Sequence, residues 1–180
     1  MDEPLKPGDL LATRTKSGLG SFLIRLGAAL RDRPNLVNHI AIVHHTDAQG
    51  TVWCIEGRPG GVGWRQAADY VADRWTICNA AQPKTATQRA TVTAGATALL
   101  GTAYDWQAIA AAAAGAFGLD QAWELKWGKN GQVPGHVVCS SLAAWLYEKA
   151  GLEHPEGDRE VAPADWVTLW IERGWASPVT

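Results

Sequence analysis

The sequence offers little from which a disulfide framework, a structural metal centre or a membrane anchor could be built. Its three cysteines, at positions 54, 78 and 139, are scattered and form no CxxC pair. This pattern argues against a disulfide framework and against a structural zinc site. The longest apolar run, from Ala108 to Leu119, falls short of the roughly 20 residues that cross a bilayer. We therefore expect no integral membrane segment.

An excess of one charge is also missing. The 16 Lys and Arg residues nearly balance the 18 Asp and Glu residues, which gives a formal net charge of -2. This balance argues against a nucleic-acid partner, which would require a basic face. The N-terminus is acidic and proline-rich and lacks the basic-then-apolar order of a secretory signal. We expect cytoplasmic synthesis without Sec export, or delivery by a non-Sec route, and the oligomeric state stays open.

What is present predicts one folded domain. The chain of 180 residues is 47% hydrophobic and 19% charged, a composition that supports a packed core. Strands are predicted by β-rich runs and helices by apolar residues at helical spacing. The expected strands are 10–14, 38–45, 51–56, 62–64 and 75–79, and the expected helices are 17–30, 85–100, 106–117, 139–150 and 163–173, with a long loop at 118–136. This is an α+β fold in a single domain, residues 1–180.

Cys139 is the first candidate for catalysis. It opens an expected helix, where unpaired backbone N–H groups and the positive end of the helix dipole favour the thiolate. The adjacent N–H groups could also hold an oxyanion. A free cysteine is equally a common small core residue, so its position alone leaves both interpretations open. Cys54 lies in mid-strand without this activation and ranks below Cys139.

His39 is the candidate base, because it begins an expected strand and its imidazole would lie at the end of that strand. A histidine whose ring is satisfied by backbone at a sheet end is the alternative. A metal site shared with His44 and His45 is disfavoured. His39 and His45 would lie roughly 20 Å apart on a strand, and His44 would point to the other face. His136, three residues before Cys139, is a rival base.

Glu56 is the candidate third member of a triad, and its role depends on the register of the expected hairpin. If Val43 pairs with Val52, His39 lies directly opposite Glu56, with Cβ atoms about 4.5–5.5 Å apart. The carboxylate would then fix the tautomer of the imidazole. A slip of one residue would move Glu56 to the other face. An acid that merely flanks the following turn is the alternative interpretation.

Tyr104 is the last candidate. It follows Gly101 and precedes an alanine-rich stretch. Its phenol could donate a hydrogen bond to a developing oxyanion, and an ordinary structural tyrosine is the alternative. The residues around it do not decide between the two.

Short motifs along the chain occur in an order that resembles a known family. They are Pro7-Gly-Asp-Leu-Leu, Asn38-His-Ile-Ala-Ile-Val, Cys54-Ile-Glu-Gly with Gly61-Val-Gly, Gly101-Thr-Ala-Tyr-Asp-Trp, Val138-Cys-Ser-Ser-Leu and Val161-Ala-Pro-Ala-Asp-Trp. Their order resembles that of the circularly permuted NlpC/P60 cysteine peptidases, a papain-like branch in which the histidine precedes the cysteine. Residues 107–136 match no part of this pattern and look like an insertion.

The resemblance implies a papain-like fold, in which a Cys-bearing helix packs against a small antiparallel sheet that carries the base. It makes Cys139 the nucleophile, His39 the general base and Glu56 the residue that orients the imidazole. It also places Tyr104 near the oxyanion. The implied activity is that of a thiol hydrolase of amide bonds, often in cell-wall peptides, so the expected partner is a peptide or acyl-amide substrate. No metal or organic cofactor is expected.

Two other functions remain as alternatives. Relatives in the permuted branch handle lipid acyl groups, and Trp123 and Trp127 could cover an acyl chain in a lipid-directed hydrolase or acyltransferase, although ordinary packing explains them as well. The other alternative is a catalytically silent module that binds peptides or glycans in a Trp-rich groove. That module is favoured if a thiol-reactive probe labels Cys139 no faster than Cys54 or Cys78.

Overall fold

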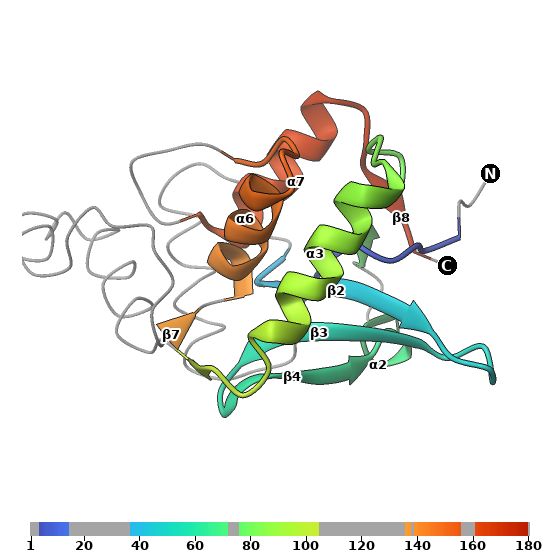
Figure 1. Ribbon diagram of the computed structural model, residues 1–180. Coiled ribbons are helices and arrows are strands. Elements are labelled where there is room, and N and C mark those ends of the chain that lie inside the picture. Colours follow the sequence, from blue (N-terminus) through green and yellow to red (C-terminus); the bar gives the residue numbers. More distant parts are fainter. Residues whose placement is uncertain are drawn as a thin grey trace, which may run out of the picture.

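The computed structural model describes residues 4–14, 37–71, 76–104, 136–137, 139–155 and 161–179. The expected helices at 17–30 and 106–117 lie outside these residues, as does the insertion at 107–136 up to its last residue. Within the described residues the chain is an α+β fold with a small antiparallel sheet and several helices (Figure 1). The predicted fold class is confirmed at this level.

The strands in the described part of the chain form two sheets. The larger is an antiparallel sheet of six strands in the order β4-β3-β2-β1-β5-β8, and the predicted hairpin is its β2–β3 pair. The smaller is the parallel pair of β6 and β7. The strands are β1 (Leu10–Thr13), β2 (His39–Thr46), β3 (Val52–Arg58), β4 (Gly61–Gln66), β5 (Ile77–Cys78), β6 (Ala103–Tyr104), β7 (His136–Val137) and β8 (Ser177–Pro178).

The longer helices begin or end at signals that the sequence carries. Thr85 caps one helix through a capping box with Gln88, and Pro163 begins another. Gly151 and Gly174 follow two helices with φ angles of 63° and 69°, a conformation that glycine adopts without strain. The described helices are α2 (Ala68–Val71), α3 (Ala86–Ala98), α6 (Cys139–Lys149) and α7 (Pro163–Glu172).

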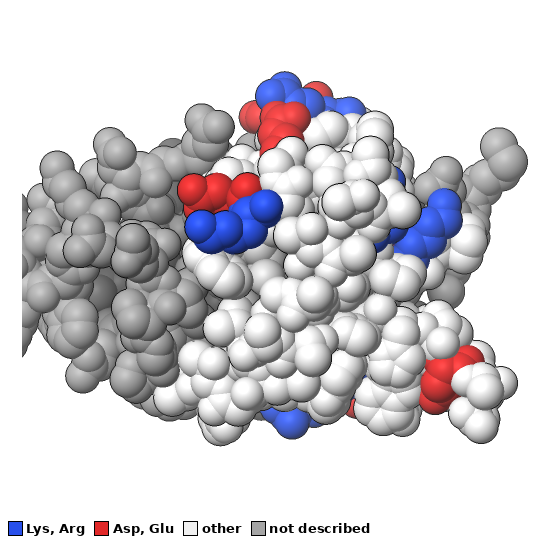
Figure 2. Space-filling model, viewed as in Figure 1, with Lys and Arg blue, Asp and Glu red and all other residues white. Residues whose placement is uncertain are grey.

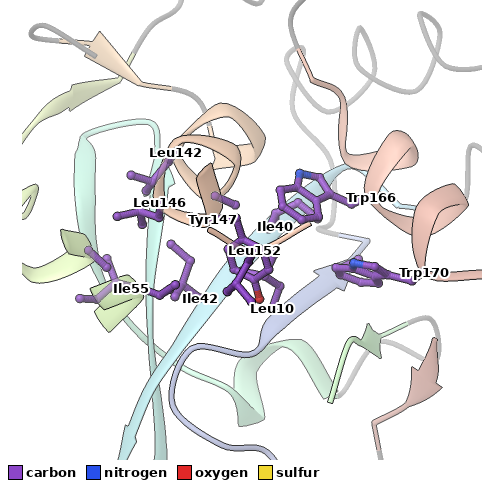
Figure 3. Close-up of a cluster of buried hydrophobic side chains, with 14 of the residues drawn as sticks. Leu10, Ile40, Ile42, Ile55, Leu142, Leu146, Tyr147, Leu152, Trp166 and Trp170 are labelled. Atoms are coloured by element: carbon purple, nitrogen blue, oxygen red, sulfur yellow. The ribbon is translucent and has the colours of Figure 1, made fainter. Parts of the chain in front are cut away.

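Both faces of the larger sheet are covered. Leu10 and Ile40 point to one face, where they pack in a cluster with α6 and with Trp166 of α7 (Figure 3). Leu11 and Ala41, their chain neighbours, point to the other face, and there they belong to a cluster with Tyr70 of α2. The sheet therefore separates the helix that begins at position 139 from the short helix α2.

A buried polar network ties the loop before β1 to the helices. Asp9 is fully buried, and its Oδ1 accepts hydrogen bonds from Lys84 Nζ at 2.9 Å and from Arg89 Nη1 at 2.8 Å. The Tyr147 hydroxyl of α6 donates to the Gly8 carbonyl at 2.8 Å. Each of these buried charges has a partner, as the low dielectric of an interior requires. Gly8 and Asp9 thus hold the loop before β1 against α3 and α6.

A β-bulge at His44 shifts the register of the β2–β3 hairpin between Val43 and His45. Val43 pairs with Cys54, so the hairpin does not adopt the register in which Val43 lies opposite Val52. The prediction that His44 and His45 point to opposite faces is also wrong, because their Nδ1 atoms lie 2.9 Å apart. A bulge inserts an unpaired residue into one strand, so regular alternation fails there.

Two further observations bear on partners. Among the described residues, no helix has both the length and the apolar character needed to cross a bilayer. On the face seen in Figure 2, lysine and arginine side chains are scattered, and the surface over α3 is largely uncharged. The described residues on this face therefore show no cluster of lysine and arginine side chains.

Candidate active site

Cys139 is the first residue of α6, as predicted, and it is buried. Helix α6 contacts both β2 and β3, whose ladder ends at the pair Ile42 and Ile55. The N–H of Ile40 lies beyond this last pair and donates to the Cys139 sulfur, as does the N–H of Ser140. The thiol therefore lies where the two strands separate, facing two donors that favour the thiolate.

His39 meets Glu56, although the two residues are not directly opposite. The pairing of Ile42 with Ile55 continues to Ala41 beside Glu56, which puts Glu56 diagonal to His39 on the same face. Without the bulge, Glu56 would lie opposite Ile42, on the other face. Nε2 of His39 is 2.5 Å from Oε2 of Glu56, and both side chains are buried. His39 and Glu56 are therefore in contact, through a diagonal pair and not through the direct pair that the register with Val43 opposite Val52 would give.

The imidazole of His39 joins Cys139 to Glu56. A side-chain hydrogen bond links the ring to the thiol, and Nδ1 is the nitrogen left for the sulfur because Glu56 holds Nε2. Burial lowers the pKa of His39, but the charges and hydrogen bonds of Cys139 and Glu56 raise it above its ordinary value. Burial raises the pKa of Cys139, but the charge and hydrogen bond of His39 bring it below its ordinary value. Both shifts favour a thiolate–imidazolium pair.

Glu56 is kept ionised by its neighbours. Burial raises the pKa of its carboxyl, but the hydrogen bonds from His39 and Tyr70 and the charge of Arg58 bring the pKa below its ordinary value. The Tyr70 hydroxyl donates to Oε2, and Arg58 Nη1 lies 3.7 Å from Oε1. A buried carboxylate with these partners stays charged at neutral pH and can orient the imidazole.

The other predicted residues lie in different settings. Tyr104 in β6 pairs with Val137 in β7, so its backbone lies beside the chain that leads into Cys139. The role of its hydroxyl stays a prediction. The side chain of His136 lies outside the described part of the chain. Cys54 is buried, and burial together with a nearby carboxylate raises its pKa to about 12, so it lacks the activation of a nucleophile.

His44 and His45 lie at the other end of β2, away from this site. His44 Nε2 lies 2.9 Å from the Thr97 hydroxyl of α3, and both rings pack edge-on against Trp64. Burial, and then the neighbouring His45, lower the pKa of His44. Among the described residues, no three His, Cys, Asp or Glu side chains come together to hold a metal ion. His44 thus ties the bulge to α3, and His45 packs beside it against Trp64.

Sequence reasoning missed Tyr70 and Arg58 as neighbours of Glu56. Arg58 had a signal, because a residue two positions along a strand shares the same face. Tyr70 had none. Its approach depends on the turn after β4, where the Tyr70 N–H donates to the Ala67 carbonyl at 2.9 Å and Tyr70 packs in one cluster with Cys54 of β3.

Comparisons of the chain with protein-family models, with curated proteins and with solved structures gave no match. The geometry of the site therefore carries the functional inference. A thiol at a helix N-terminus, a base in contact with it and an acid that holds the base are the parts that activate a cysteine for attack on a carbonyl carbon.

Proposed function

We propose that the protein is a thiol hydrolase that cleaves amide bonds through a Cys139–His39–Glu56 triad and a thioester intermediate. The observation that carries the proposal is the continuous series of hydrogen bonds from the thiol to the imidazole and on to the carboxylate. Burying charged groups costs free energy, and an ordinary core cysteine needs no charged partner. Nucleophilic catalysis by a thiol does need one.

In the proposed reaction, the Cys139 thiolate attacks the carbonyl carbon and forms the S–C bond of a tetrahedral intermediate. The N–H of Cys139 and the Tyr104 hydroxyl are the expected donors to the oxyanion. The protonated His39 gives its proton to the leaving amine as the C–N bond breaks, which leaves a thioester. His39 then takes a proton from water, whose oxygen attacks the thioester and displaces the thiolate, and a carboxylic acid is released.

The papain-like fold, in its circularly permuted NlpC/P60 form, is part of this proposal. Its support is the order of the elements, with the base on the early strand β2 and the nucleophile on the later helix α6, against a small antiparallel sheet. The family resemblance favours amide bonds of cell-wall peptides as the substrate. The proposed chemistry calls on no metal or organic cofactor.

Replacement of the nucleophile tests the proposal. We expect Cys139→Ala to abolish hydrolysis across a panel of cell-wall peptides and acyl amides, because no other group would form the thioester. Cys78→Ala is the matched control, since Cys78 is also a buried cysteine, and it should retain activity. Undiminished turnover by Cys139→Ala would end the proposal.

The acyl group trapped on the protein identifies the substrate class. After brief incubation of the unsubstituted protein with the panel, mass spectrometry should find an acyl adduct on the peptide that contains Cys139. Short acyl esters belong in the same panel. Adducts from esters alone would favour the lipid-directed alternative over an amidase.

A further inference from the structure

The Glu56 carboxylate has a second donor that the proposed triad does not use. We propose that Tyr70 is a positioning residue of the candidate active site, whose hydroxyl fixes the carboxylate so that it holds the His39 ring in line with Cys139. This inference rests on the proposed function and extends the hydrogen-bonded series by one residue. Tyr70 touches neither the thiol nor a substrate in this role, and it acts through Glu56.

The geometry around one oxygen atom carries the inference. The Tyr70 hydroxyl donates to Glu56 Oε2, the same oxygen that lies 2.5 Å from His39 Nε2. Tyr70 and Glu56 are each only 4% exposed, so water does not compete for these bonds. The carboxylate cannot turn away from the imidazole without breaking both hydrogen bonds, and buried bonds of this kind reinforce each other. Tyr70 therefore fixes the direction in which Glu56 points.

The backbone of Tyr70 is itself held in place. Its N–H donates to the Ala67 carbonyl at 2.9 Å, and its carbonyl accepts from the Thr76 hydroxyl at 2.9 Å. The Thr76 hydroxyl also lies 3.2 Å from the hydroxyl of Thr13 on β1. The phenol thus approaches Glu56 from a fixed support, as a positioning group must.

The charges around this pair keep the phenol a donor. Burial, and then the charge of Glu56, raise the pKa of Tyr70, so its hydroxyl stays protonated at any pH used in an assay. The other titratable groups that act on Tyr70 or Glu56 are His39 of β2, Cys54 and Arg58 of β3, and Arg65 of β4. Removing the phenol would take away one of the two hydrogen bonds that hold Oε2 in place, so the carboxylate could turn away from the His39 ring. The imidazolium that stabilises the thiolate would then weaken.

The test is the pH dependence of Cys139 alkylation by iodoacetamide, which needs no substrate. The rate of alkylation rises with pH as the thiolate forms, and this rise is the acid limb of the rate–pH profile. We expect Tyr70→Phe to move the acid limb to higher pH by about half a pH unit to one pH unit. This shift corresponds to a roughly three- to tenfold slower reaction at pH values below the limb. An unchanged limb, with Cys139 of the unsubstituted protein still alkylated faster than Cys78, would overturn the role of Tyr70 and leave the triad standing. If the unsubstituted Cys139 reacts no faster than Cys78, the triad and this inference both fail.

Two controls separate positioning from support of the fold. Tyr147→Phe removes another buried phenol, which bonds Gly8 and Asn79, and it should lower thermal stability without moving the limb. In a Glu56→Gln background, Tyr70→Phe should cause no additional shift, because it acts through the carboxylate. An equal shift in both backgrounds would contradict the inference.

A variant of nearly unchanged size keeps the test independent of folding. Site-specific 3-fluorotyrosine at position 70 is a stronger donor than tyrosine and fills nearly the same space. Because it keeps the hydrogen bond to Glu56 Oε2, it should leave the acid limb of Cys139 alkylation close to that of the unsubstituted protein. A limb that moves as far as in Tyr70→Phe would count against Tyr70 as a positioning residue.

Discussion

Glu56→Gln removes the negative charge beside His39 while keeping the shape of the side chain and an oxygen that accepts hydrogen bonds. Given the 2.5 Å contact between Nε2 and Oε2, the charge centres of the imidazolium and the carboxylate lie about 4 Å apart. At an effective dielectric constant of about 20, this pair is worth about 4 kcal/mol, or about three pKa units of His39 at most. The decrease in the pKa of His39 changes the pKa of the Cys139 thiol only in part. We therefore expect the acid limb of Cys139 alkylation to move to higher pH by about one pH unit.

The assay has two readouts. Alkylation of Cys139 is followed by mass spectrometry across pH, and hydrolysis is measured at neutral pH, where we expect a loss of roughly 100-fold or more. Glu153→Gln is the matched control, because Glu153 forms an ion pair with Arg173 in which the two side chains are 41% and 51% exposed. Such a surface pair is worth at most about 1 kcal/mol, and neither readout should change. An alkylation profile of Glu56→Gln that superimposes on that of the unsubstituted protein would refute the reasoning.

Three further outcomes follow from the same structure. Hydrolysis should show a bell-shaped pH profile. The lowered pKa of the Cys139 thiol puts the rising limb below about 8.5, and the raised pKa of the His39 imidazole puts the falling limb above about 6.5. A rising limb at or above the ordinary thiol value would contradict the ion pair. Gly95→Val should lower the free energy of unfolding, measured in urea, by about 2 kcal/mol, because a β-carbon at this position would lie 2.4 Å from Leu146 Cδ2. Its control is Ala94→Val on the exposed side of the helix, which should lower it by about 0.5 kcal/mol. Asp9→Asn should lower the free energy of unfolding by about 3–5 kcal/mol in the same measurement, because it leaves the fully buried Lys84 side chain without its carboxylate partner. A decrease under about 1 kcal/mol would contradict a stabilising role for this ion pair.

Most secondary structure of the described residues could be predicted because its signals are local. Thr85 with Gln88, Pro163 and Gly174 mark helix ends through bonds and φ angles that involve only neighbouring residues. The helix that begins at Cys139 was predicted in the same way. These preferences act over one or two helical turns, and distant parts of the chain are not needed to satisfy them.

The candidate site depended on contacts between distant parts of the chain. The bulge at His44 has no marker in the sequence, yet it sets the face on which Glu56 lies and so decides whether the acid meets His39. The approach of Tyr70 depends on how the turn after β4 folds back.

By itself, the sequence determined the α+β class and the residue types that could form a catalytic triad. Only the tertiary structure decided that Cys139 and His39, a hundred positions apart, share a hydrogen bond. Strand pairings of different register use the same local conformation, so the choice among them rests on packing and charge contacts between residues far apart in the chain.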